Sequence, residues 1–465
     1  MSDHGLERVS NPEHAEIVVL NTCTVTSAAD QDARASIRRL SRQNPKCQIV
    51  VTGCYAQRAP EEIAALPGVT WVIGNSHKHE LASLLAQRDL LAEVSDSASP
   101  SARHKLCSDE QPAAVETNSS FVPVAQLRTG REPTTNGQRL FVSDIFAHTE
   151  LVAAPVFDGA NDRTRPNLKV QDGCNNRCSF CVIPYVRGQS RSLSREQVIG
   201  EVKALVAAGY HEVVISGINL GRWGRDLEAV SRGWQGFTNQ NGSRFRDLIR
   251  AILDETSLEK LRISSVEPMD WSDELIELVA ASNRIAKHAH VPMQSGSDRI
   301  LRAMHRKYRP WHYREKIEKI RTAMPTAAIG ADVMVAFPGE ADRDFELTRS
   351  AIEELPFTYL HVFTYSSRPG TAAAMMPNQV PPQIARERNR ILRELSSAKT
   401  LAFMHSFVGR SVDAITLSRF DGEATGALTD NYLKLRVRGR LRSNQWISAY
   451  VENVENGHLM GKVAA

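Results

Sequence analysis

From residue 168 onward the sequence repeats one pattern, a short apolar run followed by a longer amphipathic segment. Each longer segment has helical periodicity; in 194–209, Ser194 is placed to cap a helix and Gly209 to end it. Repeated strand–helix units predict a parallel barrel, open or partial, with its functional loops at the carboxyl ends of the strands. The short runs predict six strands, at 168–171, 212–216, 261–265, 287–291, 330–337 and 359–365.

The first 90 residues carry a shorter version of the same alternation. Strand patterns at 16–20, 48–52 and 71–73 alternate with helical patterns, which predicts an open parallel sheet. Cys23 follows the first strand within NTCTVT, and Cys54 follows the second within TGCYAQ. Because ligands gather at the carboxyl ends of such strands, we expect both cysteines at one functional edge. Two ordinary buried thiols are the alternative.

Three more cysteines follow the strand predicted at 168–171. Cys174, Cys178 and Cys181 have C-x3-C-x2-C spacing. A zinc site usually takes four protein ligands, and a disulfide framework needs an even number of cysteines, whereas this chain has seven. Three thiolates on one loop fit a [4Fe-4S] cluster that leaves one iron open to a small molecule. A zinc loop with a distant fourth ligand is the alternative.

The flanks of these cysteines carry a family resemblance. The stretch 172–192, DGCNNRCSFCVIPYVRGQSRS, resembles the signature of radical S-adenosylmethionine (SAM) enzymes, in their methylthiotransferase branch. The resemblance implies that the open iron binds the amino and carboxylate groups of SAM. Arg187 and Arg191 could meet a carboxylate or a phosphate, with a solvated surface position as the alternative. The resemblance further implies that the SAM pocket is lined by Gly217, Asn219, Glu267, Gln294 and Asp332.

The N-terminal part resembles the first domain of the same family, where three cysteines bind a second, auxiliary [4Fe-4S] cluster. Cys23 and Cys54 match two of them. The family's first cysteine follows an opening strand and helix that are absent here, so we expect an incomplete domain that holds this cluster poorly or not at all. Cys47 should not substitute, because seven strand residues separate it from Cys54 by about 23 Å. Cys107 lies in a flexible region and could reach.

The C-terminal part predicts a small β-barrel with a basic strand. Strand patterns occur at 412–417 and 447–451, and 432–442 alternates cations with apolar residues. A row of cations two residues apart suits a phosphate backbone, with a solvated strand face as the alternative. The stretch 424–437, ATGALTDNYLKLRV, also resembles the TRAM domain, an RNA-binding β-barrel. The predicted RNA-binding cations are Lys434, Arg436, Arg438, Arg440 and Arg442.

Composition and cysteine usage indicate the cellular compartment of the chain. No apolar run approaches the ~20 residues that a membrane span needs, and the first ten residues have no secretory pattern. An odd number of cysteines, three of them in one loop, suits a reducing compartment, so we expect a cytoplasmic protein without a membrane partner. The net charge of +4 does not by itself identify a nucleic-acid binder.

Together these patterns predict an α/β chain of four parts: an incomplete N-terminal open sheet (1–90), a linker poor in apolar residues (91–159), a partial (βα)6 radical SAM barrel (160–398) and a TRAM barrel (399–465). The resemblance, which includes HVFTYSSRPGT near residue 361, implies a tRNA methylthiotransferase that acts on N6-threonylcarbamoyladenosine-37. It also implies a flavodoxin- or ferredoxin-like electron donor and a sulfur source. The alternatives are the isopentenyladenosine-37 branch, the branch that modifies a ribosomal-protein aspartate, and a non-catalytic iron–sulfur RNA-binding protein.

Overall fold

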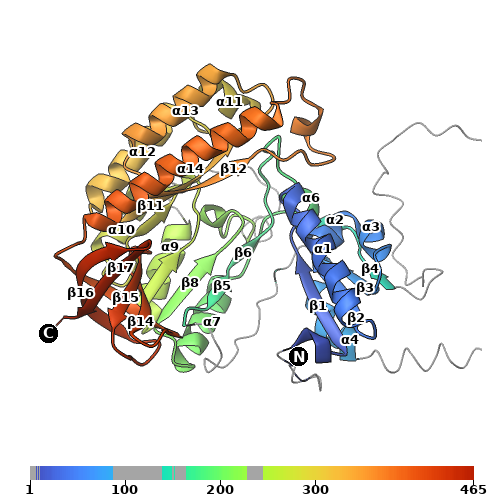
Figure 1. Cartoon of the computed structure of the whole chain (residues 1–465), viewed down its shortest axis with the longest axis horizontal. Helices are drawn as coiled ribbons and strands as arrows, with labels where there is room; N and C mark the ends of the chain where they lie inside the picture. The colour runs from blue at the N-terminus through green and yellow to red at the C-terminus, as the bar shows by residue number, and fades with distance from the viewer. Residues whose placement is uncertain are drawn as a thin grey trace, which may run out of the picture. The chain divides into compact units, whose positions relative to one another are not determined.

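The computed structural model describes residues 7, 9, 11–86, 139–148, 151, 164–227 and 244–464 (Figure 1). It divides into two compact units. The first comprises Met1–His148 with Tyr185–Arg187, and the second comprises Thr149–Pro184 with Gly188–Ala465. Most of the predicted linker 91–159, including Cys107, lies outside the described residues.

The first unit contains a parallel four-stranded sheet. Its strands lie in the order β1-β2-β3-β4, which confirms the predicted open sheet. Residues 139–141 fall within the predicted linker 91–159, but they pair with β3 as a fourth strand. The strands are β1 (Ile17–Thr22), β2 (Gln48–Gly53), β3 (Val69–Gly74) and β4 (Arg139–Phe141).

Helices pack their apolar stripes against this sheet. Thr26 caps the first one, because its hydroxyl accepts from the backbone N–H of Ala29 at 3.2 Å, and Ile37 of the same helix is fully buried. The helices are α1 (Ser27–Gln43), α2 (Cys54–Arg58), α3 (Pro60–Ala64) and α4 (Leu81–Ala86), with 3-10 turns η2 (Pro12–His14), η3 (Lys78–Glu80) and η5 (Ile145–Ala147).

The second unit contains the six parallel strands that the sequence predicts. They form two three-stranded sheets, β5-β8-β9 and β10-β11-β12, and a bridge between Leu261 and Ile285 joins the sheets at their adjacent edges. Together they give the expected partial barrel. The strands are β5 (Asn167–Lys169), β8 (Glu212–Ser216), β9 (Lys260–Ile263), β10 (His288–His290), β11 (Ala328–Val335) and β12 (Tyr359–Thr364).

Helices cover the outer face of this partial barrel. The predicted cap at Ser194 is confirmed as a capping box with Gln197, and the chain leaves that helix through Gly209 at a φ of 87°. The helices are α7 (Arg195–Ala207), α9 (Arg244–Glu255), α10 (Asp273–Ala281), α11 (Asp298–Ala303), α12 (Pro310–Ala323), α13 (Asp342–Glu354) and α14 (Pro382–His405), with 3-10 turns η6 (Leu220–Arg222), η7 (Pro268–Asp270) and η8 (Ala372–Met375). The short helix α6 (Ile183–Arg187) follows Cys181, and its residues Tyr185–Arg187 belong to the first unit.

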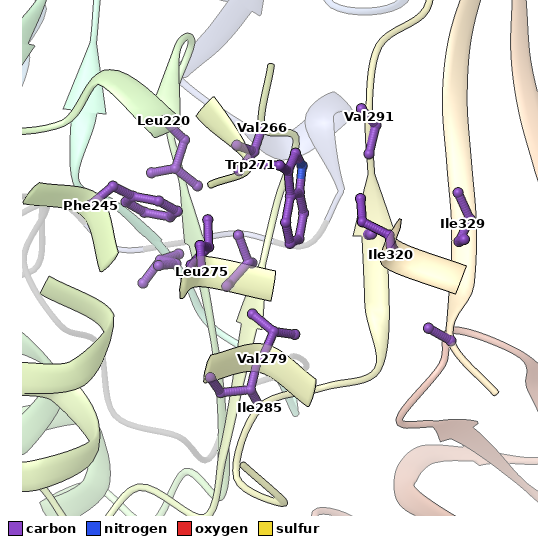
Figure 2. Close-up of a cluster of buried hydrophobic side chains, with 14 of the residues drawn as sticks. Leu220, Phe245, Val266, Trp271, Leu275, Val279, Ile285, Val291, Ile320 and Ile329 are labelled. Carbon is purple, nitrogen blue, oxygen red and sulfur yellow. The ribbon is translucent and has the colours of Figure 1, made fainter. Parts of the chain in front are cut away.

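The core of the second unit lies between the strands and these helices. Figure 2 shows part of it, with Trp271 and Leu275 near Val279 and Ile285, and with Ile320 of α12 near Val291. Alternate strand residues point into this apolar layer, as period 2 requires. The other residues of each strand therefore face the inside of the barrel.

A closed five-stranded barrel follows α14, as expected for the C-terminal part. The basic strand is shorter than the alternation predicts, because it ends at Arg438 and Gly439 turns the chain with a φ of 93°. Arg440 and Arg442 therefore lie beyond the strand. The strands are β13 (Ser411–Phe420), β14 (Ala424–Thr429), β15 (Lys434–Arg438), β16 (Trp446–Glu455) and β17 (His458–Val463).

Candidate active site at the carboxyl ends of the strands

The loop with Cys174, Cys178 and Cys181 leaves the barrel just after β5 and a short hairpin, β6 (Gln171–Asp172) with β7 (Arg191–Ser192). Gly173 is required there, because a Cβ on it would lie 1.9 Å from the carbonyl oxygen of Gln189. Ser179 anchors the loop to the end of α11, since its hydroxyl donates to the carbonyl of Ala303 at 2.7 Å. The loop is thus fixed at its start and again between Cys178 and Cys181.

Nitrogen donors surround two of these sulfurs. Cys174 Sγ lies 3.4 Å from the backbone N–H of Asn176 and 3.7 Å from Asn219 Nδ2. Cys178 Sγ lies 3.4 Å from Arg306 Nη1. Such donors stabilise a thiolate and the sulfur ligands of a metal cluster. The loop therefore offers the hydrogen-bond environment that an iron–sulfur centre needs.

Two thiols of this loop, Cys174 and Cys181, are hard to ionise alone. Burial raises the pKa of Cys181 to about 12, and burial also raises the pKa of Cys174. Bound iron would supply the positive charge that makes thiolates stable there. In the described part of the chain no three His, Cys, Asp or Glu side chains are gathered as a finished metal site. The fit rests on the thiol-only donor set and its N–H donors.

Gln171 connects this loop to the next strand end. Its Oε1 accepts from the backbone N–H of Asn219 at 2.7 Å, and its Nε2 donates to the carbonyl of Gly173 at 2.8 Å. Gly217 makes room for the connection, because a Cβ there would lie 2.8 Å from Gln171 Oε1. The structure thus brings Gly217 and Asn219 next to the cysteine loop, through a glutamine that local sequence patterns did not reveal.

The third strand end contributes an ion pair between a buried arginine and a partly exposed glutamate. Glu267 accepts a hydrogen bond from Arg306, whose guanidinium also faces the ring of Tyr308 at 5.0 Å. Arg306 is only 8% exposed, so its charge is directed at Glu267 and Cys178 rather than at solvent. Arg306 was not among the predicted site residues. Its position within MHRKY, after a strand-end loop of small and polar residues, was the available signal.

The remaining two pocket candidates are neighbours. Gln294 has a φ of 63°, and its backbone N–H donates to the carbonyl of Asp332 at 2.8 Å. Asp332 Oδ1 lies 3.4 Å from His290 Nε2. Arg191 pairs with Asp172 at 3.8 Å and is 7% exposed, so it is not a solvated surface cation.

In the first unit the paired residues Thr22 and Gly53 place Cys23 and Cys54 at adjacent strand ends. Cys54 Sγ lies 3.0 Å from Arg187 Nε and 3.5 Å from Asn75 Nδ2. Cys23 Sγ lies 3.4 Å from the backbone N–H of Val25. Both thiols therefore have N–H donors, as Cys174 and Cys178 do.

Cys47 provides an internal contrast. Its Sγ donates to the carbonyl of Gln48 at 3.5 Å, and burial raises its pKa. It belongs to the apolar core of the first unit. It is thus a buried thiol of the apolar core, and it is still not expected to replace a cluster cysteine, because of its spacing from Cys54. Cys107, the other candidate third thiol, lies outside the described residues.

The basic residues of the C-terminal barrel are on its surface, but acidic groups accompany them. Arg436 lies 2.5 Å from Asp421, and Arg438 lies 3.4 Å from Glu452 while its side chain is 78% exposed. Arg440 faces the ring of Phe420 at 5.7 Å. Surface ion pairs contribute only ~0–1 kcal/mol, so phosphates could compete for these cations. Lys434 and Arg442 are exposed as well.

No helix in the described part of the chain is long and apolar enough to cross a membrane. Residues 168–352 match the radical SAM superfamily, and residues 1–74 match the uncharacterized protein family UPF0004. Among solved structures, the radical SAM methyltransferase TsrM from Kitasatospora setae superposes with a TM-score of 0.51 at 14% identity, over 77% of this chain and 66% of that one, just under two thirds. This likeness supports the fold.

Curated relatives align with almost the whole chain. The threonylcarbamoyladenosine tRNA methylthiotransferase MtaB of Bacillus subtilis (strain 168) is 34% identical over 94% of this chain and 85% of its own length. The protein of the same name from Aquifex aeolicus (strain VF5) is also 34% identical, over 94% and 90%. A tRNA-2-methylthio-N(6)-dimethylallyladenosine synthase of Mycobacterium sp. (strain JLS) is 31% identical over 96% and 77%.

Proposed function

This chain belongs to the tRNA methylthiotransferases of the radical SAM superfamily, and we propose that it converts N6-threonylcarbamoyladenosine at position 37 of tRNA into its 2-methylthio derivative. The observation that carries the proposal is the alignment of 94% of the chain with relatives named for that substrate. The cysteine loop at the carboxyl ends of the barrel strands supports the same chemistry.

Cys174, Cys178 and Cys181 would hold a [4Fe-4S] cluster with one iron left for SAM. The chemistry supplied when the cluster is bound is one-electron cleavage of SAM to methionine and a 5′-deoxyadenosyl radical, which activates adenine C2. Around it, Arg306 holds a positive charge beside Cys178, and Asn219 donates to Cys174. The residues that would line the SAM pocket are Gly217, Asn219, Glu267, Gln294 and Asp332.

We propose Cys23 and Cys54 as two of the three thiolate ligands that an auxiliary, sulfur-delivering cluster needs; with these two alone, we expect the chain to hold that cluster poorly. Arg187 and Asn75 donate to Cys54, which suits a sulfur that carries negative charge. The reaction requires an electron donor of the flavodoxin or ferredoxin type, a sulfur source, and a second SAM for the methyl group. Arg187 would thus act on a cluster ligand rather than on a carboxylate or phosphate of a ligand.

The C-terminal barrel would bind the tRNA through its exposed cations, and the protein would act in the cytoplasm. We also propose the domain division 1–90, 91–159, 160–398 and 399–465. The branch that acts on N6-isopentenyladenosine-37 is the second candidate, because relatives named for dimethylallyladenosine align at 31% identity. A ribosomal-protein aspartate and non-catalytic RNA binding are more distant alternatives.

Nucleoside analysis of tRNA tests the proposal. A strain without this gene should lack 2-methylthio-N6-threonylcarbamoyladenosine and accumulate the unmethylthiolated nucleoside, and the intact gene should restore it. The Cys178→Ala form should not. Loss of the isopentenyladenosine derivative instead would favour the second candidate. An unchanged nucleoside profile would overturn both.

A further inference from the structure

The inner face of the partial barrel is polar, whereas its outer face is aliphatic. Leu168, Val213, Ile215, Ile263 and Val291 belong to the apolar layer under the helices. Their neighbours along the same strands point the other way; Val214, Met334 and Phe363 among them are apolar, but several others carry hydroxyl, imidazole, carboxylate or ammonium groups. The polar inner residues are Lys169, Ser216, Ser264, His290, Asp332 and His361.

Three histidines and a tyrosine form an ordered ring group on this face. Tyr359 stacks on His288 and on His290, with ring centroids 5.9 and 6.0 Å apart and planes within 8° and 9°. Gly330 makes this possible, because a Cβ there would lie 2.0 Å from Tyr359 Cζ. His361 meets His290 edge-on at 5.4 Å. The absence of a side chain at Gly330 of β11 thus leaves the space that the ring of Tyr359 occupies.

His290 has an unused hydrogen-bonding atom. Its residue is 7% exposed, and its Nδ1 is bonded to the hydroxyl of Ser265. Its Nε2 is buried and lies 3.4 Å from Asp332 Oδ1, but among the described residues it makes no hydrogen bond. A buried polar atom without a partner costs free energy, so such an atom usually marks a place that a ligand or water completes. Nε2 points toward Asp332, on the inner face.

His361, unlike the buried His290, is exposed, although it also belongs to the ring group. Partial burial of its imidazole and the nearby His290 lower its pKa against the opposing effect of Asp332, and a lowered pKa favours the neutral form of the ring. A neutral imidazole offers one donor and one acceptor. Apolar members of the inner face, Met334 and Phe363, lie farther toward the carboxyl ends of β11 and β12.

The amino ends of these strands are covered by the C-terminal barrel. Tyr432 of that barrel lies 4.6 Å from His288, ring centroid to centroid, and Arg262 donates to the carbonyl of Asp430 at 2.8 Å. A substrate group that enters from the carboxyl ends therefore meets this ring group before it meets the covered end.

We propose that His290 and His361 bind the N6 substituent of the target adenosine and select a hydrogen-bonding, carboxylate-bearing substituent over an apolar prenyl one. The inference rests on the proposed function. C2 and the carbon that carries N6 are separated by one ring nitrogen, so a C2 that faces the cofactor places the N6 group on the adjacent wall. The threonylcarbamoyl group has amide, hydroxyl and carboxylate partners for imidazoles. A prenyl group has none and would leave them unpaired.

Selectivity built this way is strong. A pocket that must hydrogen-bond its substrate rejects an analogue without partners by about 10⁴–10⁵, whereas an apolar pocket distinguishes analogues only about 10–200-fold. Removing one hydrogen-bonding histidine should therefore lower kcat/KM for the polar substrate about tenfold to a hundredfold. It should affect the prenyl substrate little or improve it. The ratio of the two values is the informative quantity, because a general loss of activity cancels in it.

The test uses anticodon stem–loops that carry either N6-threonylcarbamoyladenosine or N6-isopentenyladenosine. The variants are H361L, H290L and H361Q, and the last of these keeps a donor and an acceptor. H312L, on the exposed face of α12, is the matched control. Each protein is measured for kcat/KM on both substrates and for the dissociation constant of each stem–loop without SAM. Iron content and melting temperature report on folding.

We expect H361L and H290L to lower the selectivity ratio and to weaken binding of the threonylcarbamoyl stem–loop, H361Q to retain part of both, and H312L to match the unaltered protein. If H290L fails to fold, the exposed His361 carries the test. An unchanged ratio and dissociation constant in H361L would overturn the inference, provided the unaltered protein prefers the threonylcarbamoyl substrate. If the unaltered protein prefers the prenyl substrate, the proposed function fails instead.

Discussion

Arg262 places its guanidinium carbon 4.4 Å from the ring centroid of Tyr432, a residue 170 positions later in the C-terminal barrel. The same guanidinium bonds Glu212 at 2.7 Å and the carbonyls of Asp430 and Thr429 at 2.8 and 3.2 Å. The side chains of Arg262 and Glu212 are both essentially buried. The guanidinium of Arg262 therefore binds the C-terminal barrel to the radical SAM core. Asn431 makes a second contact, because it donates to the carbonyl of Thr326 at 3.0 Å.

We expect Arg262→Ala to destabilise the chain by about 3–5 kcal/mol, because it leaves Glu212 buried without its cation. Urea unfolding should show the loss, and limited proteolysis should show earlier cleavage between α14 and β13. Arg195→Ala removes an exposed pair with Glu255 and is the control, with no measurable change expected. Equal behaviour of the two variants would contradict a structural role for Arg262.

The strands and cysteine loops could be predicted from sequence because both are local signals. Apolar runs of four to eight residues gave β8 and β12 to within a residue, and one capping serine gave the start of α7. Arg306 could not be predicted, because it meets Cys178 across 128 positions and no local period encodes such a contact. The contact between Arg262 and Tyr432 could not be predicted either, because these residues are also far apart in the sequence.

The end of the basic strand shows a further limit. Alternation alone extends the strand through Arg442, but one glycine at position 439 turns the chain and ends it. The polar inner face of the barrel was present in the sequence as His288, His290 and His361. Whether these histidines face the inside of the barrel depends on which face of each strand the helices cover, and only the packed structure shows that.

The cysteine loop predicts a sharp contrast between two cysteines. Cys178→Ala should lose the iron of the central cluster and abolish SAM cleavage, because three thiolates are needed to hold it. Cys47→Ala should keep both, since Cys47 is a hydrogen-bond donor in an apolar core. Iron analysis after anaerobic reconstitution and 5′-deoxyadenosine formation are the measurements. Zinc in place of iron, or cleavage by Cys178→Ala, would disprove the assignment.

Arg306 should tune the central cluster. Its Nη1 donates to Cys178, and a donor and positive charge near a sulfur ligand favour the reduced cluster. Arg306→Gln should therefore lower the midpoint potential by on the order of 50 mV, measured by redox titration with EPR. Arg309→Gln is the control, because Arg309 donates to the carbonyls of Arg306 and Tyr308 instead of to sulfur. Equal potentials in both variants would refute the effect.

The exposed cations of the C-terminal barrel should set the salt dependence of tRNA binding. Each phosphate contact contributes ~0.7 to 0.9 to the slope of log affinity against log salt, so replacing Arg436, Arg438 and Arg440 with Gln should reduce the slope by up to about 2–3. Arg436 should contribute least, because Asp421 already pairs with it. Replacing the helix-surface cations Arg314 and Lys319 should leave the slope unchanged. An unaltered slope in the barrel variant would mean that these cations only face solvent.

Cys54 should be required for sulfur insertion but not for SAM cleavage. It lies in the first unit at the end of β2, where Arg187 and Asn75 donate to its sulfur, while SAM cleavage depends on the central loop. Cys23→Ala and Cys54→Ala should therefore still form 5′-deoxyadenosine yet yield no 2-methylthio nucleoside. Cys107→Ala is the informative companion, because any auxiliary cluster needs a third thiolate and Cys47 lies in the apolar core. Loss of methylthiolation in Cys107→Ala, with a matching loss of iron, would identify that third ligand. Full methylthiolation in Cys54→Ala would remove the auxiliary site from the reaction.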